Sequence, residues 1–214
     1  MSTYILTSMF PNGFNEQTEI ILREKIDKRK KFAFIASEFH KNPEKTEKYF
    51  RYFMNMFEKA DIIFEEKYVI DGRVSIEEAQ KLVTEADVIW LSGGNTPVEF
   101  HYLQEYGLDS VIKQHSGVII GMSAGSINLA KTAICTLSCG HTEQTIYNGI
   151  GCVDISVEPH FVREKVADEL IELSQKYTIY GLCDESIIVC SGKTVEFYGE
   201  IYRLTDRNIE NISI

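Results

Sequence analysis

The sequence is poor in paired cysteines, in basic charge and in long apolar segments. Its five cysteines are an odd number without a C-x-x-C motif, which is typical of a reducing compartment rather than of a disulfide scaffold. The formal net charge of −10 argues against nucleic acid as a partner, because phosphate binding needs a basic face. No segment is apolar over the length that spans a membrane, and residues 1–6 lack the cationic start of a secretory signal. We therefore expect a cytoplasmic protein without a nucleic-acid or membrane partner.

The remaining composition is that of a folded domain. Of the 214 residues, 44% are hydrophobic and 25% are charged, which suits one compact domain with a complete core. The sequence has no repeat, low-complexity tract or linker-like segment. We therefore treat residues 1–214 as a single domain.

The first half of the sequence alternates short apolar segments with longer amphipathic ones. Strands are predicted over residues 4–9, 32–37, 61–65, 87–91 and 117–121, and helices over 15–30, 42–59, 75–85 and in two pieces up to 114. The segment FAFIAS at residues 32–37 is apolar up to its last position, as expected of a parallel strand covered on both faces. The alternation predicts an α/β fold, a three-layer sandwich with a mostly parallel central sheet.

The second half is less regular. Strands are predicted over residues 152–157, 178–182 and 186–190, a helix over 163–176 and a terminal hairpin over 194–204. Residues 132–148 are polar and are expected to be irregular. We expect functional residues at the ends of these strands, because open α/β sheets bind ligands at the carboxyl edge of the strands.

A serine between glycines is the first candidate functional residue. The motif Gly121-Met122-Ser123-Ala124-Gly125 follows an apolar strand and precedes a helix, which is the pattern of a nucleophile elbow. The glycines allow a sharp, strained turn that exposes the Ser123 hydroxyl. The Ala124 N–H then stands at a helix N-terminus, where it can stabilise a developing oxyanion. The motif also occurs where a helix packs closely on a strand, so its interpretation depends on partner residues.

A glycine-rich loop follows the strand predicted at residues 87–91. Gly93, Gly94 and Asn95 lie before a helix whose first turn, residues 96–99, has the form of a capping box. A flexible loop at this edge of the sheet can supply a second N–H donor for an oxyanion.

A serine nucleophile needs a base, and the base needs an orienting acid. His160 directly follows a predicted strand, which puts it at the same sheet edge as Ser123 if the strands are parallel. His141 lies in a polar loop and is the reserve candidate. Asp184 and Glu185 stand together after another predicted strand, and either one could face the imidazole.

Metal and nucleotide sites are poorly supported. Cys135, Cys139 and His141 share one polar segment, but their spacing matches no common zinc site. Gly93 and Gly94 are not part of a G-x-G-x-x-G motif. We therefore expect neither a metal nor another cofactor.

Taken together, four motifs resemble peptidase family S51. They are GGNT at residues 93–96, GMSAG at 121–125, EPHF at 158–161 and GLCDE at 181–185, and the resemblance extends from the first strand to about residue 190. The resemblance implies a serine peptidase whose fold is flavodoxin-like and similar to class I glutamine amidotransferases. It also implies a role for each matching residue: Ser123 as nucleophile, His160 as general base, Asp184 as orienting acid with Glu185 as runner-up, Gly94 and Ala124 as oxyanion-hole donors, and Asn95 as a substrate-binding residue.

One segment departs from the family pattern. Members of the family that act on aspartyl substrates carry arginines after the His-Phe pair, where a guanidinium can bind an acidic side chain. Here Glu164, Val166 and Glu169 stand where arginine is expected, and Arg163 and Lys165 are offset. A preference for aspartate is therefore not carried over to this sequence.

The sequence thus predicts a serine exopeptidase that acts on dipeptides or other short peptides. Two alternatives use the same scaffold: a protein that binds a peptide or amino acid without turnover, and a serine esterase or amidase. A homodimer is compatible with such a fold, although no single residue points to it.

Overall fold

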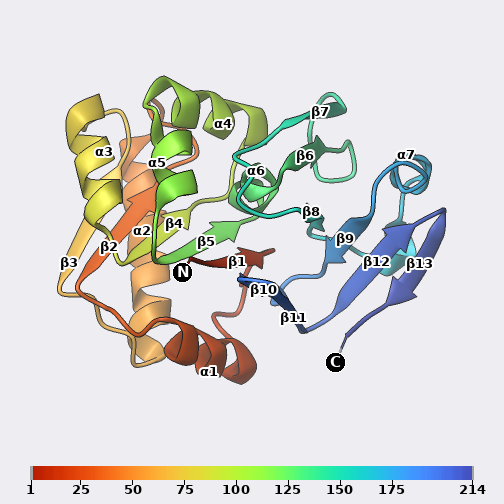
Figure 1. Cartoon of the computed structure of the whole chain (residues 1–214), viewed down its shortest axis with the longest axis horizontal. Helices are drawn as coiled ribbons and strands as arrows, with labels where there is room; N and C mark the ends of the chain where they lie inside the picture. Colours follow the sequence, from red (N-terminus) through yellow and green to blue (C-terminus); the bar gives the residue numbers. More distant parts are fainter. Residues whose placement is uncertain (1, 214) are drawn as a thin grey trace.

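The computed structural model describes residues 2–213 of the chain, and a mostly parallel sheet lies at its centre (Figure 1). Within these residues the sheet has seven strands in the order β11-β10-β1-β5-β4-β2-β3. The strands are β1 (Thr3–Thr7), β2 (Lys31–Ile35), β3 (Glu66–Ile70), β4 (Val88–Leu91), β5 (Val118–Met122), β10 (Ile187–Ser191) and β11 (Thr194–Tyr198). The pairs among β1 to β5 are all parallel, and β10 and β11 add an antiparallel edge.

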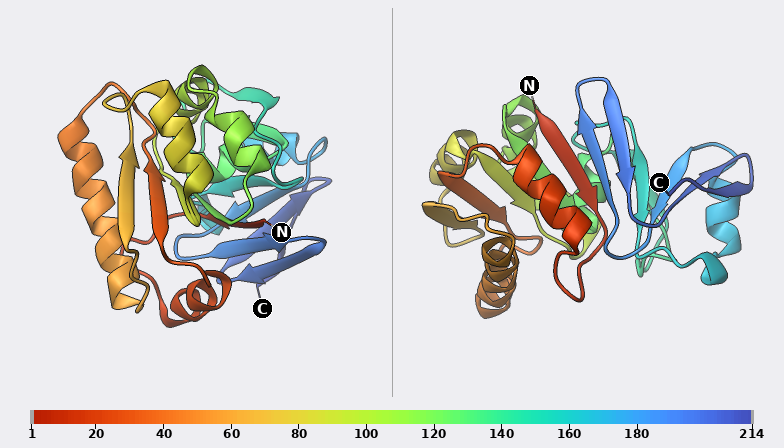
Figure 2. Two further views of the ribbon diagram at one scale, coloured as in Figure 1. Left: turned by 60° about the vertical axis from the view of Figure 1, so that its left-hand side comes forward. Right: turned by 90° about the horizontal axis from the view of Figure 1, so that it is seen from below.

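Helices cover both faces of this sheet, as the sequence predicts (Figures 1 and 2). They are α1 (Glu16–Lys25), α2 (Pro43–Lys59), α3 (Ile76–Glu85), α4 (Thr96–Glu105), α5 (Leu108–Gln114) and α6 (Ala124–Leu129). Alternate residues of β4 show the division. Val88 and Trp90 pack with α1 and α2, whereas Ile89 and Leu91 pack with the other four helices. Since neighbouring side chains of a strand point to opposite faces, a strand covered on both sides must be apolar throughout.

A second, smaller sheet lies beside the antiparallel edge of the first (Figure 1). Its order is β13-β12-β9-β8, with β8 (Ser156–Pro159), β9 (Ile179–Leu182), β12 (Ile201–Thr205) and β13 (Asn208–Asn211). A separate hairpin is formed by β6 (Thr132–Cys135) and β7 (Thr145–Asn148), and a 3-10 helix η1 (Arg163–Lys165) precedes α7 (Asp168–Leu173). Leu170, Ile179 and Leu204 form part of a third apolar cluster beneath this sheet.

Several expected elements are wrong in position or in kind. The segment 61–65 is not a strand, because the third strand is β3, which pairs in parallel with β2. The helix expected over 15–30 ends at Lys25, and the one expected over 163–176 is divided into η1 and α7. The supposedly irregular segment 132–148 contains the β6–β7 hairpin.

Two sheet assignments also differ from expectation. The hairpin expected over residues 194–204 is wrong: β11 pairs with β10 in the central sheet, whereas β12 pairs with β9 and β13 in the second sheet. His160 follows β8, so it lies at the edge of the second sheet and not at the edge that carries Ser123. The two sheets lie side by side, and the loops from both meet at one place.

Two general features of the chain bear on the sequence predictions. The five cysteines, all within residues 2–213, form no disulfide. Every helix in the described part of the chain is too short or too polar to span a lipid bilayer.

Candidate active site

Ser123 occupies a sharp turn between β5 and α6. Its backbone has φ 51° and ψ −106°, a conformation that residues with a Cβ rarely adopt. The turn requires glycine on both sides. A Cβ at Gly121 would lie 2.6 Å from the backbone nitrogen of Ser126, and one at Gly125 would lie 2.6 Å from the carbonyl oxygen of Leu91. The elbow predicted from the sequence is therefore the geometry that is found.

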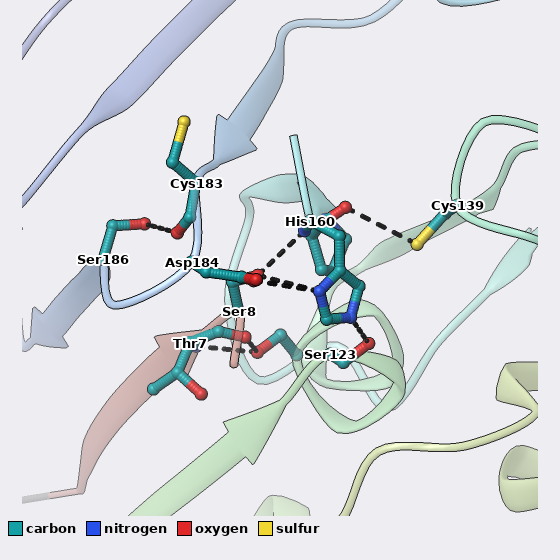
Figure 3. A network of polar contacts seen from close by, with 10 residues as sticks. Thr7, Ser8, Ser123, Cys139, His160, Cys183, Asp184 and Ser186 are labelled. Carbon is teal, nitrogen blue, oxygen red and sulfur yellow. Dashed lines mark hydrogen bonds and ion pairs between the residues drawn. The ribbon is translucent and has the colours of Figure 1, made fainter. Parts of the chain in front are cut away.

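His160 reaches this serine from the second sheet. It follows β8 with φ 56°, and its Nε2 lies 2.9 Å from the Ser123 Oγ. Its other ring nitrogen, Nδ1, lies 2.9 Å from Asp184 Oδ1. Figure 3 shows the imidazole between the serine and the carboxylate. The predicted serine, histidine and aspartate therefore form one continuous chain of hydrogen bonds.

The neighbouring Glu185 points elsewhere. Its side chain accepts a hydrogen bond of 2.8 Å from Asn12 Nδ2, and its backbone adopts φ 70°. The backbone N–H of Glu185 donates to the carbonyl oxygen of Met9 at 2.7 Å. Of the two adjacent carboxylates, Asp184 is therefore the one that faces the His160 imidazole.

Ser8, which is not among the residues predicted from the sequence, also belongs to this cluster. The residue follows β1 and has no exposed surface. Its hydroxyl donates to Asp184 Oδ1 at 2.7 Å and accepts from the backbone N–H of His160 at 2.8 Å. The available signal was its position: a polar residue at the carboxyl end of a parallel strand that pairs with β5.

The cluster is open to solvent. The side chain of His160 is 39% exposed and that of Asp184 is 43% exposed. Water therefore screens the attraction between the two groups, and their alignment depends on hydrogen-bond geometry more than on charge.

The residues expected to form an oxyanion hole flank the serine. Ala124 is the first residue of α6, so its N–H has no partner within the helix. The glycine loop approaches from the other side, and a Cβ on Gly93 would lie 3.4 Å from the Ser123 Cβ. Gly94 lines the same cavity as Ser123. Ala124 is therefore adjacent to the serine, and Gly94 borders the cavity onto which the serine opens.

Asn95 caps α4, a role that was expected of Thr96. Its Oδ1 accepts from the backbone N–H of Val98 at 3.1 Å, which makes it the N-cap of α4. Thr96, expected to be the cap, is instead the first helical residue and is buried. The Asn95 side chain also borders the cavity.

A cavity of about 400 Å³ adjoins Ser123 and His160. Its walls come from the ends of β1, β2, β4 and β5, from the loop with Cys139 and from the first turns of α2. Phe34 and Phe53 contribute apolar surface, and Lys41 and Lys45 contribute positive charge. The volume is in the range of pockets that bind small molecules.

Arg163 and Lys165, the two cationic residues that follow His160 and Phe161, do not line this cavity. Residues 163–165 form η1 and are exposed, and the described lining of the cavity includes neither Arg163 nor Lys165. Glu169 instead accepts from the backbone N–H of Leu137.

A buried polar network lies behind the cavity wall. The Glu158 carboxyl is 2% exposed and accepts from Thr136 Oγ1 at 2.7 and 2.9 Å, and burial raises its pKa to about 7. His141, the reserve base, lies 3.0 Å from the Thr136 carbonyl oxygen and 2.8 Å from Thr96 Oγ1 through its two ring nitrogens. This histidine therefore connects the hairpin to α4 and does not contact Ser123. Among residues 2–213, no group of three or more His, Cys, Asp or Glu side chains could hold a metal ion.

A strand-end serine hydrogen-bonded to a histidine, which is in turn hydrogen-bonded to an aspartate, is an arrangement used for acyl transfer. The family assignment agrees. A model of peptidase family S51 matches residues 5–198, and the chain belongs to this family. It is therefore a hydrolase of the peptidase type.

Solved structures show the same fold. A peptidase from an acI-B1 Actinobacterium has a TM-score of 0.71 and 18% sequence identity, and the match covers 100% of this chain and 94% of that one. A candidate peptidase E from Listeria monocytogenes EGD-e has a TM-score of 0.67 and 21% identity, with 92% of this chain and 98% of that one covered. The curated proteins contain no significant match.

Proposed function

We propose that the protein is a serine exopeptidase that hydrolyses dipeptides or other short peptides through an acyl-enzyme on Ser123. One observation carries the proposal: the unbroken sequence of hydrogen bonds from Ser123 Oγ through the two nitrogens of His160 to Asp184, with 2.9 Å at each step. A serine hydroxyl is a weak nucleophile until a base at this distance accepts its proton.

The roles of the residues follow from this order. His160 Nε2 accepts the serine proton as Ser123 attacks the scissile carbonyl, and it then delivers that proton to the leaving amine. Asp184 accepts a hydrogen bond from Nδ1 and stabilises the imidazolium that forms. In the second half of the reaction, His160 activates water to hydrolyse the ester. The backbone N–H groups of Gly94 and Ala124 stabilise the oxyanion in both steps.

The cavity supports a short substrate. A volume of about 400 Å³ suits a small ligand better than an extended chain. The Oδ1 of Asn95 is used for capping α4, so we assign its Nδ2 to a carbonyl oxygen of the substrate. We also keep the cytoplasm as the expected location, because five thiols without a disulfide are typical of a reducing compartment. A homodimer stays an expectation.

A fluorophosphonate probe and a panel of dipeptides and tripeptides test the proposal together. Wild-type protein should be labelled and should cleave some peptides. Ser123→Ala should lose the label and at least about a thousandfold in kcat, with unchanged circular dichroism. A wild-type protein that takes no label but binds a peptide in calorimetry would instead be a binding protein. Turnover of esters without turnover of any peptide would assign it as an esterase or amidase.

A further inference from the structure

The end of β1 contacts every strained residue of the candidate site. Ser123, His160 and Glu185 all have positive φ although each carries a Cβ, and they lie at the ends of three different strands. Their backbone N–H groups donate to consecutive residues of one segment: to the Thr7 carbonyl oxygen at 2.9 Å, the Ser8 hydroxyl at 2.8 Å and the Met9 carbonyl oxygen at 2.7 Å. Residues 7–9 therefore hold the three loops in conformations that are otherwise sparsely populated.

Ser8 differs from its two neighbours because it uses its side chain. A hydroxyl has one hydrogen to donate, and that hydrogen points to Asp184 Oδ1 at 2.7 Å. The oxygen is then left to accept from the His160 N–H. Since Ser8 has no exposed surface, water does not reach its hydroxyl to replace either bond.

This arrangement also fixes the hydrogens on the imidazole. The Asp184 Oδ1 that accepts from Ser8 is the same atom that lies 2.9 Å from His160 Nδ1. A carboxylate oxygen that accepts from both groups requires the hydrogen of the imidazole to be on Nδ1. The lone pair of Nε2 then faces the Ser123 hydroxyl, which is the tautomer that a general base needs.

We propose that Ser8 is a positioning residue that couples the two sheets: it orients the Asp184 carboxylate and the His160 backbone so that Nε2 is held against Ser123. Ser8 does not contact the reacting atoms. The proposal rests on the proposed function, because it assigns a role in activating the serine.

The rate of fluorophosphonate labelling tests this role. Ser8→Ala removes the hydroxyl, and we expect labelling to slow by about 10- to 100-fold, as for loss of a hydrogen bond to a charged group. Ser8→Thr keeps the hydroxyl and should recover most of the rate. Ser174→Ala is the matched control, because Ser174 is also a buried serine whose hydroxyl donates to one group, the Ile171 carbonyl oxygen, and accepts from a backbone N–H, that of Arg207, without contacting the histidine or the aspartate.

Two further measurements separate positioning from general stability. With a peptide that the wild type cleaves, Ser8→Ala should lower kcat and leave KM within about twofold, because the substrate cavity is intact. In proton NMR, the Nδ1–H resonance of His160 should shift or broaden in Ser8→Ala and stay in place in Ser174→Ala. If Ser8→Ala does not fold, Ser8→Cys, which keeps the size and a weak donor, should give an intermediate labelling rate.

The outcomes distinguish this inference from the proposed function. If the wild type is labelled and Ser8→Ala is labelled at the same rate, the role of Ser8 alone is overturned. The same holds if Ser174→Ala is slowed as much as Ser8→Ala. An unchanged rate in Ser8→Cys overturns it as well. Absence of labelling in the wild type rejects the proposed function and, with it, the role assigned here to Ser8.

Discussion

At the scale of single residues, the site concentrates unfavourable backbone conformations. Each residue with a Cβ in a sparsely populated region costs about 1–3 kcal/mol, and Ser123, His160 and Glu185 are three such residues. The surroundings must overcome this cost. Hydrogen bonds from these residues to residues 7–9 help to do so, because each bond satisfies a backbone donor that the turn would leave without a helix or sheet partner.

The adjacent acids give a sharp test at this scale. Asp184→Asn should lower kcat by about 10³- to 10⁴-fold, because an amide in place of the carboxylate favours the wrong tautomer of the imidazole. Glu185→Gln should change kcat by less than about threefold, because its side chain only pairs with Asn12 in an exposed position. Steady-state kinetics of both variants on one peptide, with melting temperatures as a control for folding, provide the comparison. A larger loss in Glu185→Gln than in Asp184→Asn would exchange the two roles.

At the scale of elements, the elbow depends on how closely α6 crosses β4 and β5. The sequence predicted this turn because glycine, serine and glycine follow an apolar strand, a local signal. It did not predict that Gly125 lies against Leu91, because that contact joins segments more than thirty residues apart. The same limit explains Asn95. Thr96 and Glu99 fit the spacing of a capping box, but the preceding Asn95 is also of a residue type that caps helices, and only the structure shows that Asn95 caps α4.

Gly125→Ala tests the close crossing of helix and strand. The added Cβ would lie 2.6 Å from both the Cβ and the carbonyl oxygen of Leu91, and neither can move without shifting β4. We expect the free energy of unfolding to fall by about 1–3 kcal/mol, as for other overpacked cores, together with slower labelling of Ser123. Gly93→Ala is the control, because its Cβ would first meet the flexible end of Met122 at 3.0 Å. Urea denaturation of both variants checks the prediction, which fails if Gly125→Ala is as stable as the wild type.

At the scale of the whole molecule, the central sheet was predictable and the second sheet was not. Strands such as β4 are apolar at every position. A short apolar segment between two helices is most readily interpreted as a buried strand. By contrast, β11 and β12 are separated by two residues and resemble a hairpin locally, yet the chain passes from one sheet to the other between them. β11 pairs instead with β10, which ends two residues before it, and β12 pairs with β9, which ends at Leu182. Because β11 has an equally short connection on each side, a local pattern does not show which neighbour it pairs with. The sequence therefore predicted that His160 follows a strand, as it does, but not that this strand belongs to the second sheet.

The stability of the whole molecule should depend on pH through Glu158. Burial raises the pKa of this carboxyl from 4.5 to about 7, so between these two pH values the folded protein holds a proton that the unfolded chain has released. The contribution of this group to the free energy of unfolding is therefore fully present below pH 4.5. It is lost as the pH rises from 4.5 to about 7, and it does not change further at higher pH. At about 1.4 kcal/mol for each pH unit, the loss amounts to about 3 kcal/mol.

Glu158→Gln removes this dependence because an amide stays neutral and can still accept from Thr136. The variant should become more stable relative to the wild type by about 3 kcal/mol between pH 4.5 and pH 8, measured by urea denaturation at several pH values. Glu164→Gln, an exposed residue of η1, should show a constant difference from the wild type over the same range. If the Glu158→Gln curve runs parallel to that of the wild type instead, the carboxyl is ionised in the folded protein throughout, and the network around Thr136 must hold a charge rather than a neutral acid.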